Sequence, residues 1–165
     1  MAMLKLRDRD LQAMQAHAEQ AYPEECCGLL LGRQQDDIKI LLDLLPVKNS
    51  WQDASPEMLH EINDSVCWTG SKRDRFAIAP DEMLLAQKQA RDRNLIVVGI
   101  YHSHPDHAAI PSECDRAIAW PQYSYIIVSV QNGIACDLRN WSLDEAHQFQ
   151  PEKILKIEAT SLVDE

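Results

Sequence analysis

The segment LIVVGIYHSHP, residues 95–105, decides the fold of this chain. The part from Leu95 to Tyr101 is almost wholly apolar and rich in β-branched residues, as is typical of a buried strand at the centre of a sheet. The preceding segment PDEMLLAQKQARDR, residues 80–93, is predicted to be a helix, because Pro80 suits the first position of a helix. We therefore expect a sheet with a helix packed against it.

Further helices and strands are predicted on both sides of this segment. Apolar residues recur at helical spacing in residues 7–22, and Pro23 ends that helix. A short strand is expected between Arg75 and Pro80. Short apolar runs bounded by turn-forming residues predict further strands at residues 26–32, 38–47, 124–130 and 134–141. The predicted fold class is α/β (α+β), with a single mixed β-sheet flanked by helices.

The chain is predicted to form one domain with a long internal loop. Its 165 residues, 45% of them hydrophobic, are enough to bury one core. We assign residues 1–142 to this domain and residues 143–165 to a C-terminal tail. Between residues 48 and 75 the apolar pattern is lost, although EMLHEINDSV, residues 57–66, is able to form a helix. A connection of this length in a compact domain is usually functional or mobile.

Charge and composition exclude several classes of partner. The 16 Lys and Arg residues stand against 26 Asp and Glu residues, and the formal net charge of -10 would repel phosphate backbones and anionic lipid. Nucleic acid is therefore not an expected partner. No apolar run reaches the length of about eighteen residues that a membrane-spanning helix needs, and the N-terminus lacks the apolar segment of a signal peptide. We expect a cytoplasmic protein with no membrane partner.

The cysteines are not expected to form a disulfide framework. Their number, five, is odd, and Cys26 and Cys27 are adjacent, which makes them poor candidates for an internal bridge. No CxxC motif occurs, which excludes a zinc knuckle built from cysteines.

The residues that follow the central strand carry a candidate metal site. His102 and His104 lie two apart at the end of the strand, so that both side chains project from the same face. A pair of this kind is by itself more often merely solvated. Further along, Ser112 and Asp115 lie three apart at the start of a predicted short helix, and this spacing is also that of a capping box. Two imidazoles and a carboxylate are a sound ligand set for zinc, with the fourth position open for water.

A candidate general base lies upstream, in PEECCG, residues 23–28. A lone glutamate beside the end of a helix is usually solvated. Glu25, however, directly precedes a run of residues that should be buried, which would hold its carboxylate at the edge of the sheet. Glu24 is the rival candidate, but adjacent residues on an extended chain point to opposite sides.

These residues together resemble the signature of the JAMM or MPN-plus (JAB domain) zinc metallopeptidases. The pattern consists of Glu25 ahead of Cys27-Gly28, then His102-Ser103-His104-Pro105, then Ser112 and Asp115. The resemblance covers roughly residues 4–141, and within it the chain is similar to the small bacterial members of the family. It implies an MPN/JAB-type fold with a cytidine-deaminase-like architecture. It also implies that His102, His104 and Asp115 bind one Zn²⁺ ion per chain, that Glu25 is the general base, and that Ser112 stabilises the oxyanion.

The resemblance further implies a peptidase activity and a class of substrate. Members of this family hydrolyse amide or isopeptide bonds at the C-terminal tails of ubiquitin-like proteins. In the bacterial branch the implied partner is a small β-grasp sulfur-carrier protein that ends in Gly-Gly, from which an amino acid or short peptide is released.

Other interpretations remain open at this point. A metal-free MPN-type binding or scaffold module is one alternative, and a zinc hydrolase of another small substrate is a second, although a deaminase would need a downstream Pro-Cys-x-x-Cys that is absent. A Cys-His hydrolase that uses Cys26, Cys27 or Cys114 is a third, although cysteines in an apolar strand are usually small buried hydrophobes. His107 is expected on the rim of the site. The remaining candidates are Trp51, Met58 and Trp68, which would either form a substrate-gripping surface or pack in the core.

Overall fold

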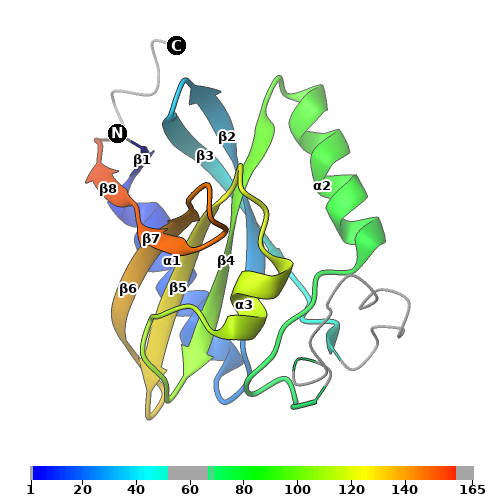
Figure 1. The fold of residues 1–165 in the computed structure, drawn as a ribbon, viewed down its shortest axis with the longest axis vertical. Helices are drawn as coiled ribbons and strands as arrows, with labels where there is room; N and C mark the ends of the chain where they lie inside the picture. Colours follow the sequence, from blue (N-terminus) through cyan, green and yellow to red (C-terminus); the bar gives the residue numbers. More distant parts are fainter. Residues whose placement is uncertain (1, 52–66, 68, 159–165) are drawn as a thin grey trace.

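The computed structural model describes residues 2–51, 67 and 69–158 (Figure 1). The helices in this part of the chain are α1 (Asp8–Ala21), α2 (Pro80–Asp92) and α3 (Glu113–Ile118). The strands are β1 (Met3–Leu6), β2 (Cys27–Gln35), β3 (Ile38–Val47), β4 (Ile96–Pro105), β5 (Ser124–Gln131), β6 (Ile134–Leu143), β7 (Phe149–Pro151) and β8 (Lys153–Lys156). They form one sheet in the order β7-β6-β5-β4-β2-β3-β1-β8. The predicted class, a single mixed sheet flanked by helices, is confirmed.

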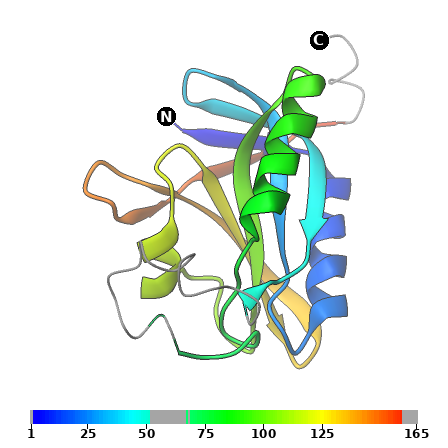
Figure 2. The same ribbon diagram turned by 90° about the vertical axis from the view of Figure 1, so that its right-hand side faces the viewer.

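β4 lies inside the sheet and has helices over both of its faces. It pairs antiparallel with β2 and parallel with β5. Val98 and Tyr101 pack in the cluster that includes Met14 of α1, whereas Ile100 packs in the cluster that includes Ala86 of α2. Figure 2 shows the sheet between α1 on one side and α3 on the other. An apolar strand without alternation is needed here because neither face meets water.

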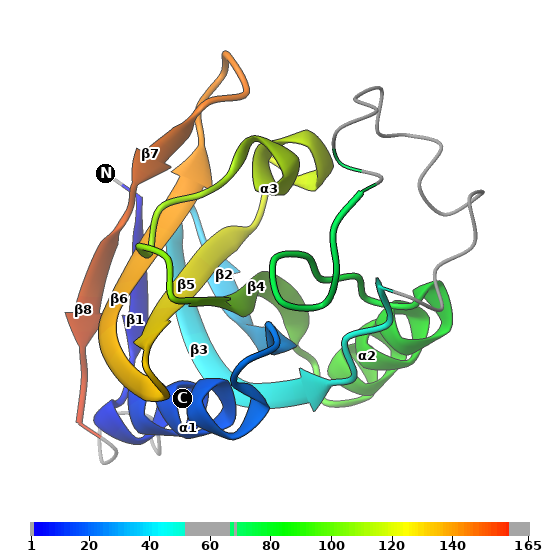
Figure 3. The same cartoon turned by 90° about the horizontal axis from the view of Figure 1, so that it is seen from below.

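A short C-terminal segment joins the two edges of the sheet. β7 pairs with β6 at one edge and β8 pairs with β1 at the other, and Figure 3 shows β7 and β8 running alongside these strands. Between them, Glu152 is 6% exposed and lies 3.5 Å from the ammonium of Lys39 on β3. Its carboxylate also accepts hydrogen bonds from Ser124 and Asn140. The stretch that the sequence indicated as a tail therefore contains two strands of the sheet.

Parts of the predicted pattern differ from the structure. The short strand expected between Arg75 and Pro80 does not form, because Ala77 exchanges backbone and side-chain hydrogen bonds with Ser50 and Asn49 instead of joining the sheet. The helix predicted for residues 57–66, with Met58, and also Trp68 lie outside the described residues. None of the helices in the described part of the chain is long and apolar enough to cross a membrane.

The expectation for the cysteines is wrong in one respect. Cys67 and Cys114 form a disulfide across 47 residues of sequence. Cys26 and Cys27 are free and buried, as expected of small hydrophobes, and Cys136 is free and exposed. Spacing in the sequence did not reveal the pair, because only the folded path of the chain brings residue 67 next to α3.

Candidate metal centre

Three side-chain atoms converge at the end of β4. The Nε2 atoms of His102 and His104 are 3.1 Å apart, and they lie 3.3 Å and 3.1 Å, respectively, from Oδ2 of Asp115. Ligands about 2.0–2.1 Å from a tetrahedral zinc ion are about 3.3 Å from one another. The triangle formed by these three atoms therefore has the size that a zinc ion requires, and two imidazoles with one carboxylate are suitable donors for it. The structure brings together the three residues that the sequence indicated as candidate ligands.

Neighbouring groups orient each of these donors. Nδ1 of His104 donates to the carbonyl of Ala108 at 2.8 Å, which leaves the lone pair of Nε2 free for a metal. The ring of His102 stacks on Phe76, with centroids 4.4 Å apart. The Asp115 carboxylate accepts from the backbone N–H of Ser112 at 2.9 Å, while the Ser112 hydroxyl accepts from the Asp115 N–H at 3.0 Å. The same two residues, Ser112 and Asp115, thus form the capping box of α3 and belong to the candidate site.

Burial and mutual contacts shift the pKa values of the three residues. Burial lowers the pKa of His102, which favours the neutral imidazole. Burial acts to lower the pKa of His104 too, but its hydrogen bond to Asp115 raises it above the ordinary value. Burial acts to raise the pKa of Asp115, but the charge and hydrogen bonds of the two histidines hold it well below its usual range. The carboxylate is therefore ionised and ready to bind a cation.

Glu25 lies beside the three donors. Cys27 pairs with His102 across β2 and β4, which places Glu25 next to the end of β4. A carboxylate oxygen of Glu25 lies within 4.8 Å of ring nitrogens of both His102 and His104, so Glu25 is itself a candidate ligand. Asp115, whose Oδ2 is 3.3 Å and 3.1 Å from the two histidines, is the other candidate for the third position.

The environment of Glu25 suits a general base. The residue is 4% exposed, and its Oε1 is buried without a hydrogen-bond partner in the described part of the chain. Burial raises the pKa of Glu25 well above its ordinary value, and the charges of Asp115 and Asp74 raise it further. A carboxylate with a raised pKa takes up a proton more readily near neutral pH. Its neighbour Glu24 is exposed, because it lies in the turn after α1, where its N–H donates to the carbonyl of Ala21, and not on an extended chain as the sequence argument assumed.

Two residues that the sequence did not reveal support this site. Asn49 donates from Nδ2 to the carbonyls of Glu25, at 3.1 Å, and Arg75, at 2.9 Å. Phe76 fixes the ring plane of His102 by stacking. Both lie at the ends of the long connection between β3 and α2: no motif marked Asn49, and Phe76 was expected only as part of a short strand, not as a contact of His102.

The other residues considered from the sequence do not join the three donors. His107 is exposed, as expected for a rim residue. Burial raises the pKa of Cys26 to about 11 and that of Cys27 further still, so neither thiol is a ready nucleophile. Trp51 does reach the site region, since it lines the cavity described next.

A cavity of about 430 Å³ opens beside His102 and Asp115. It lies between the start of α2 and α3, over β4 and β5. Apart from the two polar residues its walls are mainly apolar, with Phe76, Met83 and Trp120 among them. A cavity of this size with a few polar groups at one end is typical of a binding site for a small molecule or a peptide segment.

Comparison with known proteins gives consistent matches along most of the chain. Residues 8–144 match the family described as prokaryotic homologs of the JAB domain. A desampylase from Haloferax volcanii is 29% identical over 128 residues, which cover 77% of this chain and 76% of that protein. A CysO-cysteine peptidase from Mycobacterium tuberculosis is 26% identical over 156 residues, covering 93% and 92% of the two chains.

Two solved structures share this fold. A protein from Desulfitobacterium hafniense has a TM-score of 0.72 and 28% identity, with 94% of each chain covered. A protein from Salinibacter ruber has a TM-score of 0.66 and 30% identity, with 94% of this chain and 92% of the other covered.

Proposed function

The chain belongs to the prokaryotic JAB-domain family, and from this premise we propose that it is a zinc-dependent metallopeptidase. Its proposed reaction is hydrolysis of an amide or isopeptide bond at the C-terminal Gly-Gly tail of a ubiquitin-like sulfur-carrier protein. The observation that carries this proposal is the triangle of His102, His104 and Asp115 donor atoms, 3.1–3.3 Å apart, with the buried Glu25 beside it.

The side chains of the site have distinct proposed roles. His102, His104 and Asp115 would hold the zinc ion. When bound, zinc lowers the pKa of water and polarises the scissile carbonyl. Glu25 accepts the proton of the attacking water and returns it to the leaving amine, since its free oxygen and raised pKa suit both steps. The Ser112 hydroxyl accepts from Asp115 and still has its own hydrogen to donate to the developing oxyanion.

The proposed substrate follows from the relatives and from the cavity. The names desampylase and CysO-cysteine peptidase, carried by relatives, support cleavage at the tail of a small protein. Glycine has no side chain to clash close to the buried ligands, whereas the wider apolar cavity has room for the residues that precede it. We place the cut after the second glycine, which releases an amino acid or a short peptide and exposes the carboxylate of the carrier.

The test is to incubate the protein with a carrier extended by a few residues beyond Gly-Gly and to follow its mass. The wild type should remove the extension and stop after the second glycine. The Glu25→Gln variant is the blank and should leave the extension in place. If the extension survives while an unrelated unstructured peptide is cut, the proposed substrate is wrong.

A further inference from the structure

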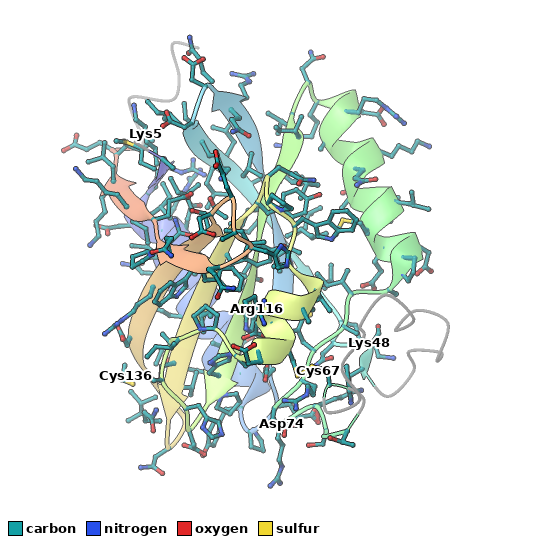
Figure 4. All side chains as sticks on the ribbon, viewed as in Figure 1. Lys5, Lys48, Cys67, Asp74, Arg116 and Cys136 are labelled. Atoms are coloured by element: carbon teal, nitrogen blue, oxygen red, sulfur yellow. A yellow bond between two sulfur atoms is a disulfide. The ribbon has the colours of Figure 1, made fainter. Side chains whose placement is uncertain are left out.

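The third candidate ligand stands on a helix that is weakly held. His102 and His104 belong to β4, a strand of the core, whereas Asp115 belongs to α3, which has six residues, each of them at least partly exposed. Beyond the candidate ligand contacts, the carbonyl of Arg116 accepts from His147 Nε2 at 3.0 Å. The covalent tie of α3 is the disulfide from Cys114 to Cys67, and Figure 4 shows Cys67 close to the helix that carries Arg116. The disulfide is therefore one of the ties that hold Asp115 in place, together with the capping box of Ser112 and the contacts with the two histidines.

The other end of the disulfide, Cys67, lies next to the segment that contacts Glu25, residues 69–76. Cys67 is 2% exposed and is followed by residues 69–76. In this segment the carbonyl of Lys72 accepts from the Glu25 N–H at 2.6 Å. Cys67, Cys114 and Asp115 line one small hollow of about 20 Å³ together with Phe76, the residue that stacks on His102. The disulfide thus joins the segment that contacts Glu25, the candidate base, to α3, the helix that carries Asp115.

We propose that the Cys67–Cys114 pair is a reversible redox modification site that sets how tightly the metal centre holds its ion. In the oxidised state the disulfide keeps α3 in place, so that Asp115 stays with the two histidines. In the reduced state α3 is released from Cys67 and the third ligand is less well positioned. The inference rests on the metal centre of the proposed function and adds its regulation.

The proposed oxidant is a low-molecular-weight disulfide such as oxidised glutathione. The Cys114 thiolate, the more accessible of the pair, attacks it, forms a mixed disulfide and displaces one thiolate. The Cys67 thiolate then attacks the Cys114 sulfur, closes the internal disulfide and displaces the second thiolate. The two electrons of the cysteine thiols pass to the oxidant, and their two protons end on the two thiols released. An excess of a small thiol reverses both steps.

Linkage makes the effect reciprocal. If oxidation of the pair raises the affinity for the metal by some factor, metal binding must favour oxidation of the pair by the same factor. A group that only positions a metal ligand typically changes metal affinity by about 10- to 100-fold. We expect a change of this order between the two states.

The test compares zinc release from the oxidised and the reduced protein. The zinc-loaded chain is treated with oxidised glutathione or with a phosphine reductant, and zinc transfer to a chromogenic chelator is followed without any substrate. The reduced protein should release zinc about tenfold faster or more. Cys67→Ser, which leaves α3 itself unchanged, should behave like the reduced protein under both conditions. Cys136→Ser is the matched control and should respond to redox treatment as the wild type does.

Two further readouts make the result decisive. Thiol titration in denaturant should find Cys26, Cys27 and Cys136 free after oxidation and all five cysteines free after reduction. In the metal-free chain, hydrogen exchange of residues 113–118 should be faster after reduction. Five free thiols after oxidation, or equal zinc release from the two states, would overturn the proposal. A chain that binds zinc and responds to redox treatment but cleaves no carrier would contradict only the proposed function.

Discussion

Glu24 and Glu25 are chemically identical neighbours, and their surroundings give them different properties. Glu24 is exposed, whereas Glu25 is 4% exposed and has a carboxylate oxygen within 4.8 Å of the ring nitrogens of His102 and His104. Desolvation disfavours the charged carboxylate, and the negative charge of Asp115 acts in the same direction, so the pKa of Glu25 is raised. Glu25 therefore combines a raised pKa with a position beside the candidate metal ligands.

Glu25→Gln should therefore keep the metal and the fold but lose turnover by about a hundredfold or more, because the amide has the same shape and cannot accept the proton of water. Steady-state kinetics and zinc content of the same sample measure the two effects. Cys27→Ser is the control for a thiol mechanism and should stay active. Near-normal turnover in Glu25→Gln, or complete loss in Cys27→Ser with the metal retained, would reverse the assignment.

The ligand assignment makes a separate prediction about metal content. Wild type should carry about one zinc ion per chain, and His104→Ala should lose most of it, because the remaining two donors do not make a sufficient tetrahedral site. Elemental analysis after gel filtration gives both values. His107→Ala, an exposed histidine of the same loop, is the matched control and should retain zinc. Equal zinc content in wild type and His104→Ala would exclude the site.

The sequence indicated the candidate metal ligands themselves but not the residues that hold them in position. His102 and His104 were predictable because a strand fixes the relative direction of residues two apart, and Asp115 because a helix does the same for residues three apart. Asn49, Phe76 and Cys67 were not predictable, because their contacts depend on the path of the connection between β3 and α2. No local period determines such a path.

Among the elements, α3 serves both the fold and the proposed chemistry. Its N-cap is Ser112, whose hydroxyl accepts from the Asp115 N–H at 3.0 Å. Ser112→Ala should cost about 1 kcal/mol of stability through the lost cap. If Ser112 also donates to the oxyanion, the rate should fall by about a hundredfold or more, which is beyond what the lost cap explains.

Ser112→Thr separates the two roles of the hydroxyl. It keeps both the cap and the donor, and it should restore most of the rate. Zinc content must be measured in both variants, because a rate that falls only in proportion to lost zinc would assign Ser112 to the cap alone.

The predictability of each element follows from its length and its burial. β4 was expected because residues 95–101 are almost wholly apolar, and α2 was expected because Pro80 suits the first position of a helix. β7 and β8 have three and four residues and alternate too briefly to show a period. The apolar residues 76–79 resemble a strand, but their partners are Asn49 and Ser50 rather than another strand.

At the scale of the whole molecule, the cavity is assembled from α2, α3, β4, β5 and β7. Trp120 lines it and is 51% exposed, while its backbone N–H is fixed separately by a hydrogen bond to Tyr125. Trp120→Ala should raise KM for the extended carrier by about tenfold, equivalent to about 1.4 kcal/mol of binding, with zinc content unchanged. Leu84→Ala, at a 66% exposed position outside the cavity, is the control and should leave KM unchanged. An unchanged KM in Trp120→Ala would place the substrate elsewhere.

The buried carboxylate of Glu152 lies between β7 and β8, the strands at the two edges of the sheet. The Glu152 carboxylate is buried with Lys39, and it also accepts from Ser124 and Asn140, so one side chain connects β3, β5 and β6 with the segment between β7 and β8. Removing one partner of a buried ion pair leaves the other charge without compensation and typically costs about 3–5 kcal/mol. Glu152→Ala should therefore lower the free energy of unfolding by about this amount, as measured by urea denaturation.

Two further variants separate burial from charge as the cause of this loss. The exposed pair between Arg93 and Asp43, 2.7 Å apart, provides the matched control, and Asp43→Ala should cost about 1 kcal/mol or less because solvent screens such a pair. The double variant Lys39→Met/Glu152→Leu should recover much of the stability lost in Glu152→Ala, since no uncompensated charge remains in the interior. Equal losses in Glu152→Ala and Asp43→Ala would show that this buried pair does not hold the two edges of the sheet together.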